Sequence, residues 1–319
     1  MLSLLFDGGS GILSMIGAVA AFAGVFWLLL TRRDMLPKDQ GREYAVNGKQ
    51  SAGKARGAGI IFVSIFVVAS LIFGNIDAED VIYLVLLVAE MISGYLDDAA
   101  AIPWGELKKG LIDLAIAVAT TAVYIHYNGT AVTFALIGKT VNMPVVLFFI
   151  LSILLIWTAI NVVNCSDGVD GLSGSLSIVS LMGFYALNIA LRNTDGNSQI
   201  LFFCTCLLAY LWFNAAPSIL MMGDAGSRAM GYFIALTALT SRSPFMFIPL
   251  ALVLILDGGL GLVKVSLLRY AHVSIMEHVR TPLHDHVRKV LGWSNTHTVF
   301  RFVIIQIMIC LIFVLPLFH

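Results

Sequence analysis

Ten apolar stretches constrain the fold of this chain more than any other feature of its sequence. They cover residues 11–30, 57–73, 81–94, 111–126, 144–160, 174–191, 200–215, 229–240, 244–262 and 299–317. A helix needs about 20 apolar residues to cross a bilayer core, and sometimes as few as about 17. The third and eighth stretches are shorter, so we expect their helices to extend into the flanking loops. With 59% hydrophobic and 12% charged residues, the chain is predicted to be an all-α polytopic membrane protein with about ten transmembrane helices in a single domain, residues 1–319.

The distribution of Lys and Arg predicts which loops face the cytoplasm. Segments 32–56, 95–110, 161–173, 216–228 and 263–298 carry 15 of the 19 basic residues, whereas the intervening loops carry only Lys139, Arg192 and Arg242. Because basic residues concentrate in cytoplasmic loops, the first set is predicted to be cytoplasmic, with both termini outside. The net charge of zero gives no general attraction to nucleic acid, so no nucleic-acid partner is expected.

Two connecting segments carry signals of their own. Residues 263–280 mix apolar side chains with Lys264, Arg269 and Glu277, which predicts that the ninth span breaks and continues as an amphipathic helix at the membrane interface. In the outside loop 127–143, Asn128-Gly129 precedes the β-prone residues 132–134, a pattern that favours a small hairpin.

Five aspartates fall at the cytoplasmic ends of the predicted helices: Asp97, Asp98, Asp167, Asp170 and Asp224. Carboxylates at a membrane boundary are costly unless they are paired, hydrated or bound to metal, so they are candidates for function. Repulsion between neighbouring carboxylates favours a shared divalent cation that also meets phosphate oxygens, and Mg²⁺ is the expected ion. Each aspartate has a structural alternative, because Asp commonly caps helices and forms turns. Five of them on one face favour a site.

Amides and glycines beside these acids are candidates for nucleotide binding. Asn161 and Asn164 end the fifth stretch and Asn214 ends the seventh, so their side chains either read a base or sugar or cap the helix ends. Gly168 lies between two of the aspartates, where a backbone that approaches a phosphate or nucleoside closely requires glycine.

Histidines and basic residues add further cytoplasmic candidates. His284 and His286 are separated by one residue in the last cytoplasmic segment, and they suit diphosphate binding, proton transfer or a metal site. Lys49, Lys54 and Arg56 lie in or beside a Gly-rich stretch of the first cytoplasmic segment. Their charges either bind phosphate or only set the topology, and topology is the stronger interpretation for most of them.

Three acids lie within apolar stretches: Glu90, Asp113 and Asp257. Glu90 is about two helical turns before Asp97, so it either supports the site or pairs with a basic neighbour. Asp257 is a candidate for lining a groove.

Several long motifs follow one another in a recognisable order. They are the pair Asp97-Asp98, the run Asn161-x-x-Asn164-x-x-Asp167-Gly168-x-Asp170-Gly171-Leu172, Trp212-Phe213-Asn214 ahead of Met222-Gly223-Asp224-x-Gly226-Ser227, and Pro282-Leu283-His284-x-His286 followed by Gly292-Trp293. In this order they resemble the polyprenyl-phosphate N-acetylhexosamine-1-phosphate transferases, and the last motif is similar to the muramoyl branch of that family.

The resemblance implies a ten-helix enzyme of the bacterial cell membrane with its active site at the cytoplasmic face. Such an enzyme transfers phospho-MurNAc-pentapeptide from UDP-MurNAc-pentapeptide to undecaprenyl phosphate, giving lipid I and UMP in peptidoglycan synthesis, with Mg²⁺. A homodimer is a further expectation. The resemblance implies that Asp97, Asp98, Asp224 and His284 are catalytic and that Asp224, Asp97 and Asp98 hold the metal. The implied substrate-binding residues are Lys49, Asn161, Asn164, Asp167, Gly168, Asp170, Asn214, Met221 and His286.

This sequence departs from the family pattern at four places. Asp285 replaces the middle one of three histidines, and Asp257 stands where the family has a glutamate. The Gly-rich stretch 53–59 lacks the hydroxyl side chains that the family has there, and Lys49 is the best candidate for its displaced lysine. Met221 occupies a position where the family often has Phe against uracil, so base stacking is expected to be weaker.

Other interpretations of the sequence predict different features. A UDP-N-acetylglucosamine:polyprenyl-phosphate transferase would share the chemistry but use another sugar nucleotide. An intramembrane aspartyl protease needs its two aspartates deep in the membrane, whereas Asp224 lies at the boundary. A transporter predicts acids near mid-bilayer and inverted repeats, and the sequence shows no internal repeat.

Overall fold

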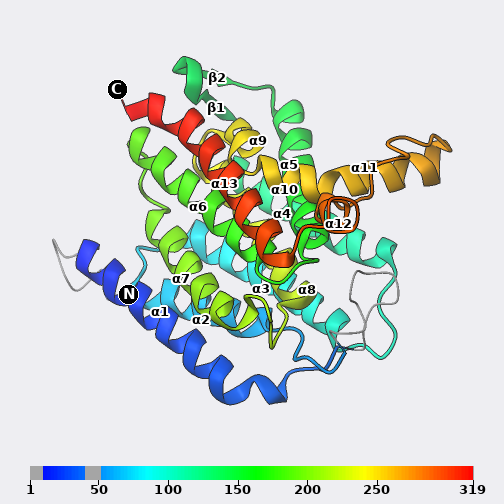
Figure 1. The fold of residues 1–319 in the computed structure, drawn as a ribbon. Coiled ribbons are helices and arrows are strands. Elements are labelled where there is room, and N and C mark those ends of the chain that lie inside the picture. The colour runs from blue at the N-terminus through cyan, green and yellow to red at the C-terminus, as the bar shows by residue number, and fades with distance from the viewer. Residues whose placement is uncertain (1–9, 40–51, 319) are drawn as a thin grey trace.

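Helices form nearly all of the described structure (Figure 1). The computed structural model describes residues 10–39 and 52–318, so Lys49 lies outside the described residues. Each predicted apolar stretch is helical. Nine of them correspond to α1 (Ser10–Arg32), α2 (Gly59–Phe73), α3 (Ala78–Asp98), α4 (Glu106–Asn128), α5 (Val145–Ser166), α6 (Leu172–Ala190), α7 (Asn197–Asn214), α8 (Gly223–Thr240) and α13 (Asn295–Val314). Short 3₁₀ turns occur at η2 (Arg33–Met35), η5 (Pro244–Met246) and η8 (Leu315–Phe318).

The chain is a polytopic helical membrane protein. Five helices of its described part are long and apolar enough to cross a membrane: Gly11–Met35, Glu106–Asn128, Val145–Ser166, Leu172–Ala190 and Asn295–Phe318. A sixth candidate is a helix pair bent by 71°. Helix α2 has only 15 residues, and α3, α7 and α8 carry more polar side chains, so these four do not qualify by length and composition. The number of ten spans stays a prediction.

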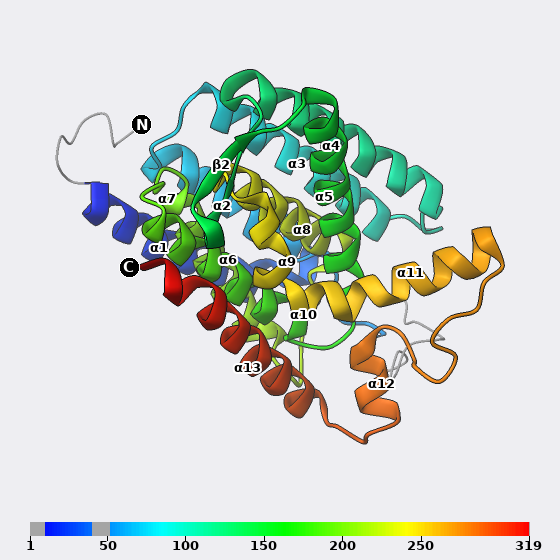
Figure 2. The ribbon, with the colours of Figure 1, turned by 90° about the horizontal axis from the view of Figure 1, so that it is seen from above.

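Helix α8 lies at the centre of the bundle, and every residue from Gly223 to Leu239 is buried. Two glycines on neighbouring helices let their backbones approach it closely. A Cβ on Gly94 of α3 would lie 2.4 Å from the Asp224 carbonyl oxygen, and a Cβ on Gly59 of α2 would lie 2.1 Å from the Gly226 amide nitrogen. Such small-residue contacts are typical of helices that pack inside membranes. They fix the N-terminus of α8 against α2 and α3. In the view from above, α8 lies among the other helices of the bundle (Figure 2).

The ninth helical segment is broken at Ala251, between α9 (Phe247–Leu250) and α10 (Leu252–Leu254). Gln306 of α13 satisfies backbone groups that the break leaves free. Its Nε2 donates to the carbonyl oxygens of Pro249 and Leu250, each at 3.0 Å, and its Oε1 accepts from the Val253 amide at 2.8 Å. A broken helix is tolerated in a membrane when a neighbouring side chain supplies these partners.

The predicted break of the ninth span is confirmed, but its position and the length of the extension were wrong. After the bend the helix continues through η6 (Ile255–Gly259), α11 (Leu260–Ser266) and η7 (Leu267–Ala271), and it protrudes from the bundle (Figure 2). It ends at Ala271, because the next residue, His272, has a positive φ of 55° that lies outside the helical region. The predicted amphipathic helix over 263–280 therefore stops at residue 271. The short helix α12 (Leu283–Lys289) follows in the same segment.

The predicted hairpin is confirmed as a two-stranded antiparallel sheet (Figure 1). Strand β1 (Ala131–Phe134) pairs with β2 (Lys139–Asn142), so that Ala131 lies opposite Asn142. The turn is formed by η4 (Ala135–Ile137) and a left-handed Gly138. Asn128-Gly129 instead ends helix α4, because that helix continues further than its apolar stretch.

Candidate active site

The carboxylates of Asp97 and Asp224 converge on one ammonium group. Asp97 is in the last turn of α3 and Asp224 is in the first turn of α8, two helices that pack closely. The Nζ of Lys109, in the first turn of α4, lies 2.8 Å from Asp224 Oδ2 and forms an ion pair with Asp97 Oδ2. The other oxygen of Asp97 accepts from the Trp104 amide at 2.6 Å. Three helices thus bring two acids to a single cation position.

Asp98 binds the N-terminus of α8. Its Oδ1 accepts from the Asp224 amide at 3.0 Å and its Oδ2 from the Ala225 amide at 3.1 Å. An anion at a helix N-terminus is favoured by the exposed amides and the helix dipole. Gly223 has a positive φ of 67°, and a Cβ there would lie 2.1 Å from Asp98 Oδ2, so only glycine fits this contact. Asp98 therefore positions Asp224.

Arg56 joins the segment that precedes α2 to these acids. Its Nε donates to Asp98 Oδ1 at 2.8 Å, its Nη2 lies 3.6 Å from Asp224 Oδ1, and its Nη1 lies 3.4 Å from Asp39 Oδ1. A purely topological role predicts a positive charge in this segment, but it does not predict ion pairs with three aspartates. The topological interpretation therefore does not account for Arg56.

Two of the three aspartates that Arg56 contacts, Asp98 and Asp224, differ in their affinity for protons. Burial alone would raise the pKa of Asp224, but Lys109 and Arg56 outweigh it and lower the pKa to about 2. Burial raises the pKa of Asp98 to about 6, although Arg56 and the two amide donors act in the opposite direction. Asp224 is consequently a permanent anion at physiological pH, as a cation ligand must be.

The Gly-rich stretch lies beside the segment that precedes α8. The Met221 amide donates to the Ala55 carbonyl oxygen at 2.8 Å, and the Met221 carbonyl oxygen accepts from the Ala58 amide at 3.0 Å. Next to this pairing, Lys54 Nζ donates to Ser218 Oγ at 2.8 Å and lies 3.7 Å from Asp170 Oδ2. Lys54 and Asp170 are therefore neighbours in space, and the side chain of Met221 is partly exposed beside them.

The asparagine candidates differ in what they contact. Asn164 donates to Ser227 Oγ at 2.9 Å and also hydrogen-bonds Asp224, so it adjoins the paired acids. Asn161 donates to Asp113 Oδ2 at 3.3 Å. Asn214 is buried and ties two loops together, because its Oδ1 accepts from the Gly171 amide at 2.8 Å and its Nδ2 donates to the Leu220 carbonyl oxygen at 2.9 Å. Asn214 thus shapes the loops instead of pointing into open space.

Asp257 holds His284 beside the loop that follows α5. The backbone amide of His284 donates to Asp257 Oδ1 at 2.7 Å, and its Nδ1 lies 2.8 Å from Asp257 Oδ2. A carboxylate at Nδ1 favours the tautomer that carries its proton there. The Nε2 edge faces Gly168, where a Cβ would lie only 2.3 Å away. Asp257 therefore orients His284, and this pair brings α12 against the Asp167-Gly168 loop.

The other residues of this segment face outward more than His284 does. His286 Nδ1 accepts from the Arg280 amide at 3.3 Å, in an exposed position. Asp285 lies 3.5 Å from Arg288 Nη1, so its charge is partly balanced within α12. Asp167 and Gly168 are accessible at the end of α5.

A buried ion triad lies beneath the paired acids. Arg228 Nη2 is 2.9 Å from Glu90 Oε1 and also pairs with Asp113. All three residues are at most 2% exposed. The pairing of Glu90 with a basic neighbour, one of its two predicted roles, is confirmed. The prediction that Arg228, the basic residue of segment 216–228, is a loop charge is wrong, because it lies inside α8.

Sequence reasoning missed Lys109 and Arg228 as members of the site and its support, and it left Arg56 open between phosphate binding and topology. Lys109 and Arg228 were treated as topological charges, since pairing between helices has no fixed spacing along the chain. One feature of the sequence could have identified Lys109 as a member of the site. It precedes Asp113 by four residues, so a single helical face presents both, just as one face of α8 presents Asp224 and Arg228.

The described residues supply part of a metal site. No group of three or more His, Cys, Asp or Glu side chains within 10–39 and 52–318 is arranged to hold an ion by itself. Mg²⁺, however, is usually held by one or two carboxylates together with substrate phosphates and water. Asp97 and Asp224 already converge on a positive group, the Lys109 ammonium. The donor set therefore fits a magnesium ion that is shared with a diphosphate.

Known proteins with similar sequences define the class of this one. Residues 80–242 match Glycosyl transferase family 4. The chain is 39% identical over 310 residues to the phospho-N-acetylmuramoyl-pentapeptide-transferase of Treponema pallidum (strain Nichols), covering 90% of this chain and 85% of that protein. The enzymes of the same name from Symbiobacterium thermophilum (29% over 312 residues, 92% and 90% covered) and Clostridium perfringens (27% over 277 residues, 82% of each) are also similar.

Fold, site and similarity together define a polytopic membrane transferase of Glycosyl transferase family 4. Within that class, the chain belongs to the phospho-N-acetylmuramoyl-pentapeptide-transferase family. The resemblance drawn from the motifs is thereby confirmed.

Proposed function

We propose that this chain transfers phospho-MurNAc-pentapeptide from UDP-MurNAc-pentapeptide to undecaprenyl phosphate, forming lipid I and releasing UMP. Its relatives bear the name of this activity. The structural observation that carries the proposal is the convergence of Asp97 and Asp224 on one cation position, beside the guanidinium of Arg56. Reaction between two phosphate anions needs such a concentration of positive charge and ordered acids.

The proposed setting is the cytoplasmic face of the bacterial cell membrane. Ten spans would place both termini outside. The grouping of Arg56, Asp98, Lys109 and Asp224 supports this topology, because all four come from segments predicted to be cytoplasmic. We further propose a single domain, with a homodimer as the expected assembly, which size measurement in detergent would test.

Mg²⁺ is the proposed ion, held by Asp97 and Asp224 together with the substrate diphosphate, while Asp98 keeps Asp224 in place. When bound, it supplies positive charge that offsets the charge developing on UMP. Lys109 would then turn from the carboxylates toward a phosphate oxygen, because a cation between the two acids takes over its role there.

In the proposed reaction an oxygen of the lipid phosphate attacks the β-phosphorus of the sugar nucleotide, and the bond from that phosphorus to the bridging oxygen of UMP breaks. Asp97 orients the lipid phosphate or accepts its proton. Arg56 and Lys109 hold phosphate oxygens. His284 presents Nε2 near the Gly168 loop, where it contacts the diphosphate or sugar, and His286 lies at the edge of the same region.

The nucleoside is proposed to lie between the α5 end and the Gly-rich stretch. Asn164, Asp167, Gly168 and Asp170 border this region, and Lys54 neutralises Asp170 at 3.7 Å. Asn161 and Asn214 would act by holding Asp113 and the Gly171 loop in place. Met221 gives a partly exposed apolar surface for the base.

The test is product identification by mass spectrometry with purified protein, undecaprenyl phosphate and Mg²⁺. UDP-MurNAc-pentapeptide and UDP-N-acetylglucosamine are supplied in separate reactions. We expect UMP and lipid I only from the first. Asp224→Asn should abolish Mg²⁺-dependent UMP release, whereas Glu277→Gln, on the exposed segment after η7, should retain it. Product from UDP-N-acetylglucosamine alone would favour the rival sugar, and full activity of Asp224→Asn would contradict the metal assignment.

A further inference from the structure

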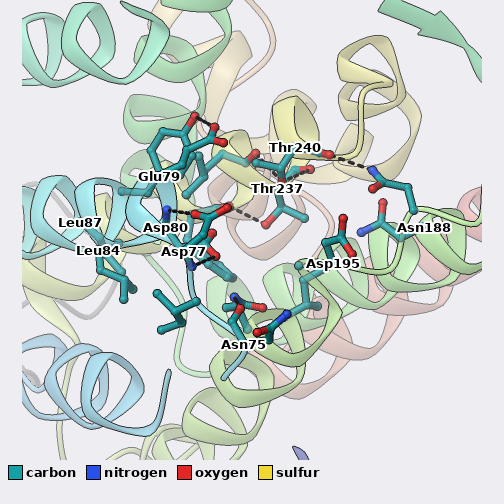
Figure 3. Close-up of a pocket in the computed structure, with 18 of the residues that line it drawn as sticks. Asn75, Asp77, Glu79, Asp80, Leu84, Leu87, Asn188, Asp195, Thr237 and Thr240 are labelled. Atoms are coloured by element: carbon teal, nitrogen blue, oxygen red, sulfur yellow. Dashed lines mark hydrogen bonds between the residues drawn. The ribbon is translucent and has the colours of Figure 1, made fainter. Parts of the chain in front are cut away.

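A polar cavity of about 480 Å³ lies at the end of α3 opposite Asp97 and Asp98 (Figure 3). It is lined by the start of α3, the end of α4, the α6–α7 connection and the end of α8. Helix α3 has 21 residues, so its two ends are about 30 Å apart at 1.5 Å per residue. The cavity is therefore separate from the candidate active site. Its volume is in the range of small-molecule pockets, roughly 300–1,000 Å³.

The cavity is lined by acids on two sides. Asp77, Glu79 and Asp80 belong to the start of α3, and Asp195 belongs to the α6–α7 connection. Figure 3 shows Asp195 across the cavity from Asp77 and Asp80. Arg242 is the one Lys or Arg among the described residues that line it. Burial, together with Asp77 and its acidic neighbours, raises the pKa of Asp80 to about 6, as expected for carboxylates that lack a matching cation.

The helix start explains only part of this cluster. Asp77 and Asp80 form a capping box, because the Asp77 side chain accepts from the Asp80 amide and the Asp80 side chain from the Asp77 amide. Glu79 accepts from the Tyr83 hydroxyl at 2.5 Å and from Asn128 Nδ2 at 2.6 Å. Asp195, on the opposite wall, belongs to neither arrangement.

Asn188 gives an independent indication of a ligand. It is 3% exposed, and its Nδ2 donates to Asn197 Oδ1 at 3.0 Å, whereas its Oδ1 has no hydrogen-bond partner among the described residues. The amide projects from α6 toward the cavity in Figure 3. A buried carbonyl oxygen without a donor is costly, so a donor from a ligand or water in the cavity is expected.

The chemistry of the walls selects the class of ligand. The lining offers carboxylate and amide oxygens, which accept hydrogen bonds from an ammonium group. The acids are not gathered closely enough for a bare metal ion, since no such group of three occurs in the described part of the chain. We propose that this cavity binds a linear polyamine, with one ammonium at the Asp77, Glu79 and Asp80 wall and another at Asp195.

Spermidine is the probe, titrated into the purified full-length protein and followed by isothermal calorimetry. The matched neutral probe is 1,4-butanediol, and Mg²⁺ is titrated alone as the metal control. Asp195→Asn is the main variant, because Asp195 is exposed and its replacement by the similarly shaped amide removes only the charge. Glu277→Gln removes another exposed acid, which lies outside the cavity. UMP release is measured in parallel for each protein.

We expect saturable spermidine binding that Asp195→Asn weakens by about tenfold, which corresponds to loss of about 1.4 kcal/mol. Glu277→Gln should bind as the wild type does, and neither variant should change UMP release. Equal binding by wild type and Asp195→Asn would overturn the proposal. Mg²⁺ binding that Asp195→Asn weakens as much as it weakens spermidine binding, or equal binding of the diol, would overturn it as well.

Discussion

The guanidinium of Arg228 lies 2.9 Å from the carboxylate of Glu90 in the interior of the helical bundle, and it also pairs with Asp113. Each partner belongs to a helix that carries a residue of the candidate site: α3 carries Asp97, α4 carries Lys109 and α8 carries Asp224. The triad thereby fixes the rotation of three helices relative to one another. On each helix the member of the triad lies one or two turns from the site residue, so the ion pairs of the triad keep Asp97, Lys109 and Asp224 together.

Removing Arg228 is expected to be strongly destabilising. Arg228→Leu leaves two buried carboxylates without their cation, which costs about 3–5 kcal/mol of unfolding free energy. Replacing all three charges, with Glu90→Leu, Asp113→Leu and Arg228→Met, should cost far less, because no buried charge is left unpaired. Denaturant unfolding in micelles compares the two proteins. A single variant as stable as the wild type would show that the triad does not hold these helices.

Lys109 is expected to matter for catalysis and Lys108 is not. Lys109→Met removes the ammonium that contacts Asp97 and Asp224, and we expect UMP release to fall by about 10²-fold, as for the loss of one charge-stabilising donor. Lys108→Met is the matched control, since Lys108 is exposed and lies 3.2 Å over the Trp104 ring. Initial rates of UMP release measure both. Equal rates would remove Lys109 from the active site.

Asp257 is expected to act through His284. Asp257→Asn loses the carboxylate that fixes the Nδ1 proton, so activity should fall by about 10–100-fold, the usual cost of removing an orienting partner. The fall should appear in kcat and in the pH profile of the rate, whereas an effect limited to folding would lower only the amount of active protein. An unchanged pH profile would count against this role.

Asp80 is expected to make stability depend on pH. Its pKa is raised from the ordinary 3.8 to about 6, so its contribution to stability is complete below about pH 4 and is lost as the pH rises through about 6. Asp80→Asn should flatten the change in unfolding temperature between pH 4 and pH 7. Thermal unfolding at one-unit intervals measures this. An identical slope in wild type and variant would mean that other groups titrate there.

The sequence by itself determined the helices and most members of the candidate site. Apolar stretches long enough for a bilayer have no other means of satisfying their backbone groups, so their helical state was predictable. Even the short third stretch was expected to lengthen, and α3 does continue to Asp98. Asp97, Asp98 and Asp224 were predicted to lie on one face, and the structure brings them together.

Only the tertiary structure decided which charge meets which. Spacing along the chain gives the position of a residue on its own helix, but partners on another helix depend on how the two are rotated and how closely they pack. Lys109 lies between Asp97 and Asp224, and Arg228 lies beneath them, because glycine contacts let α8 approach its neighbours closely. The bend of the ninth segment likewise depends on Gln306, which lies 55 residues beyond Ala251 in the chain and is adjacent to the break only in the folded protein.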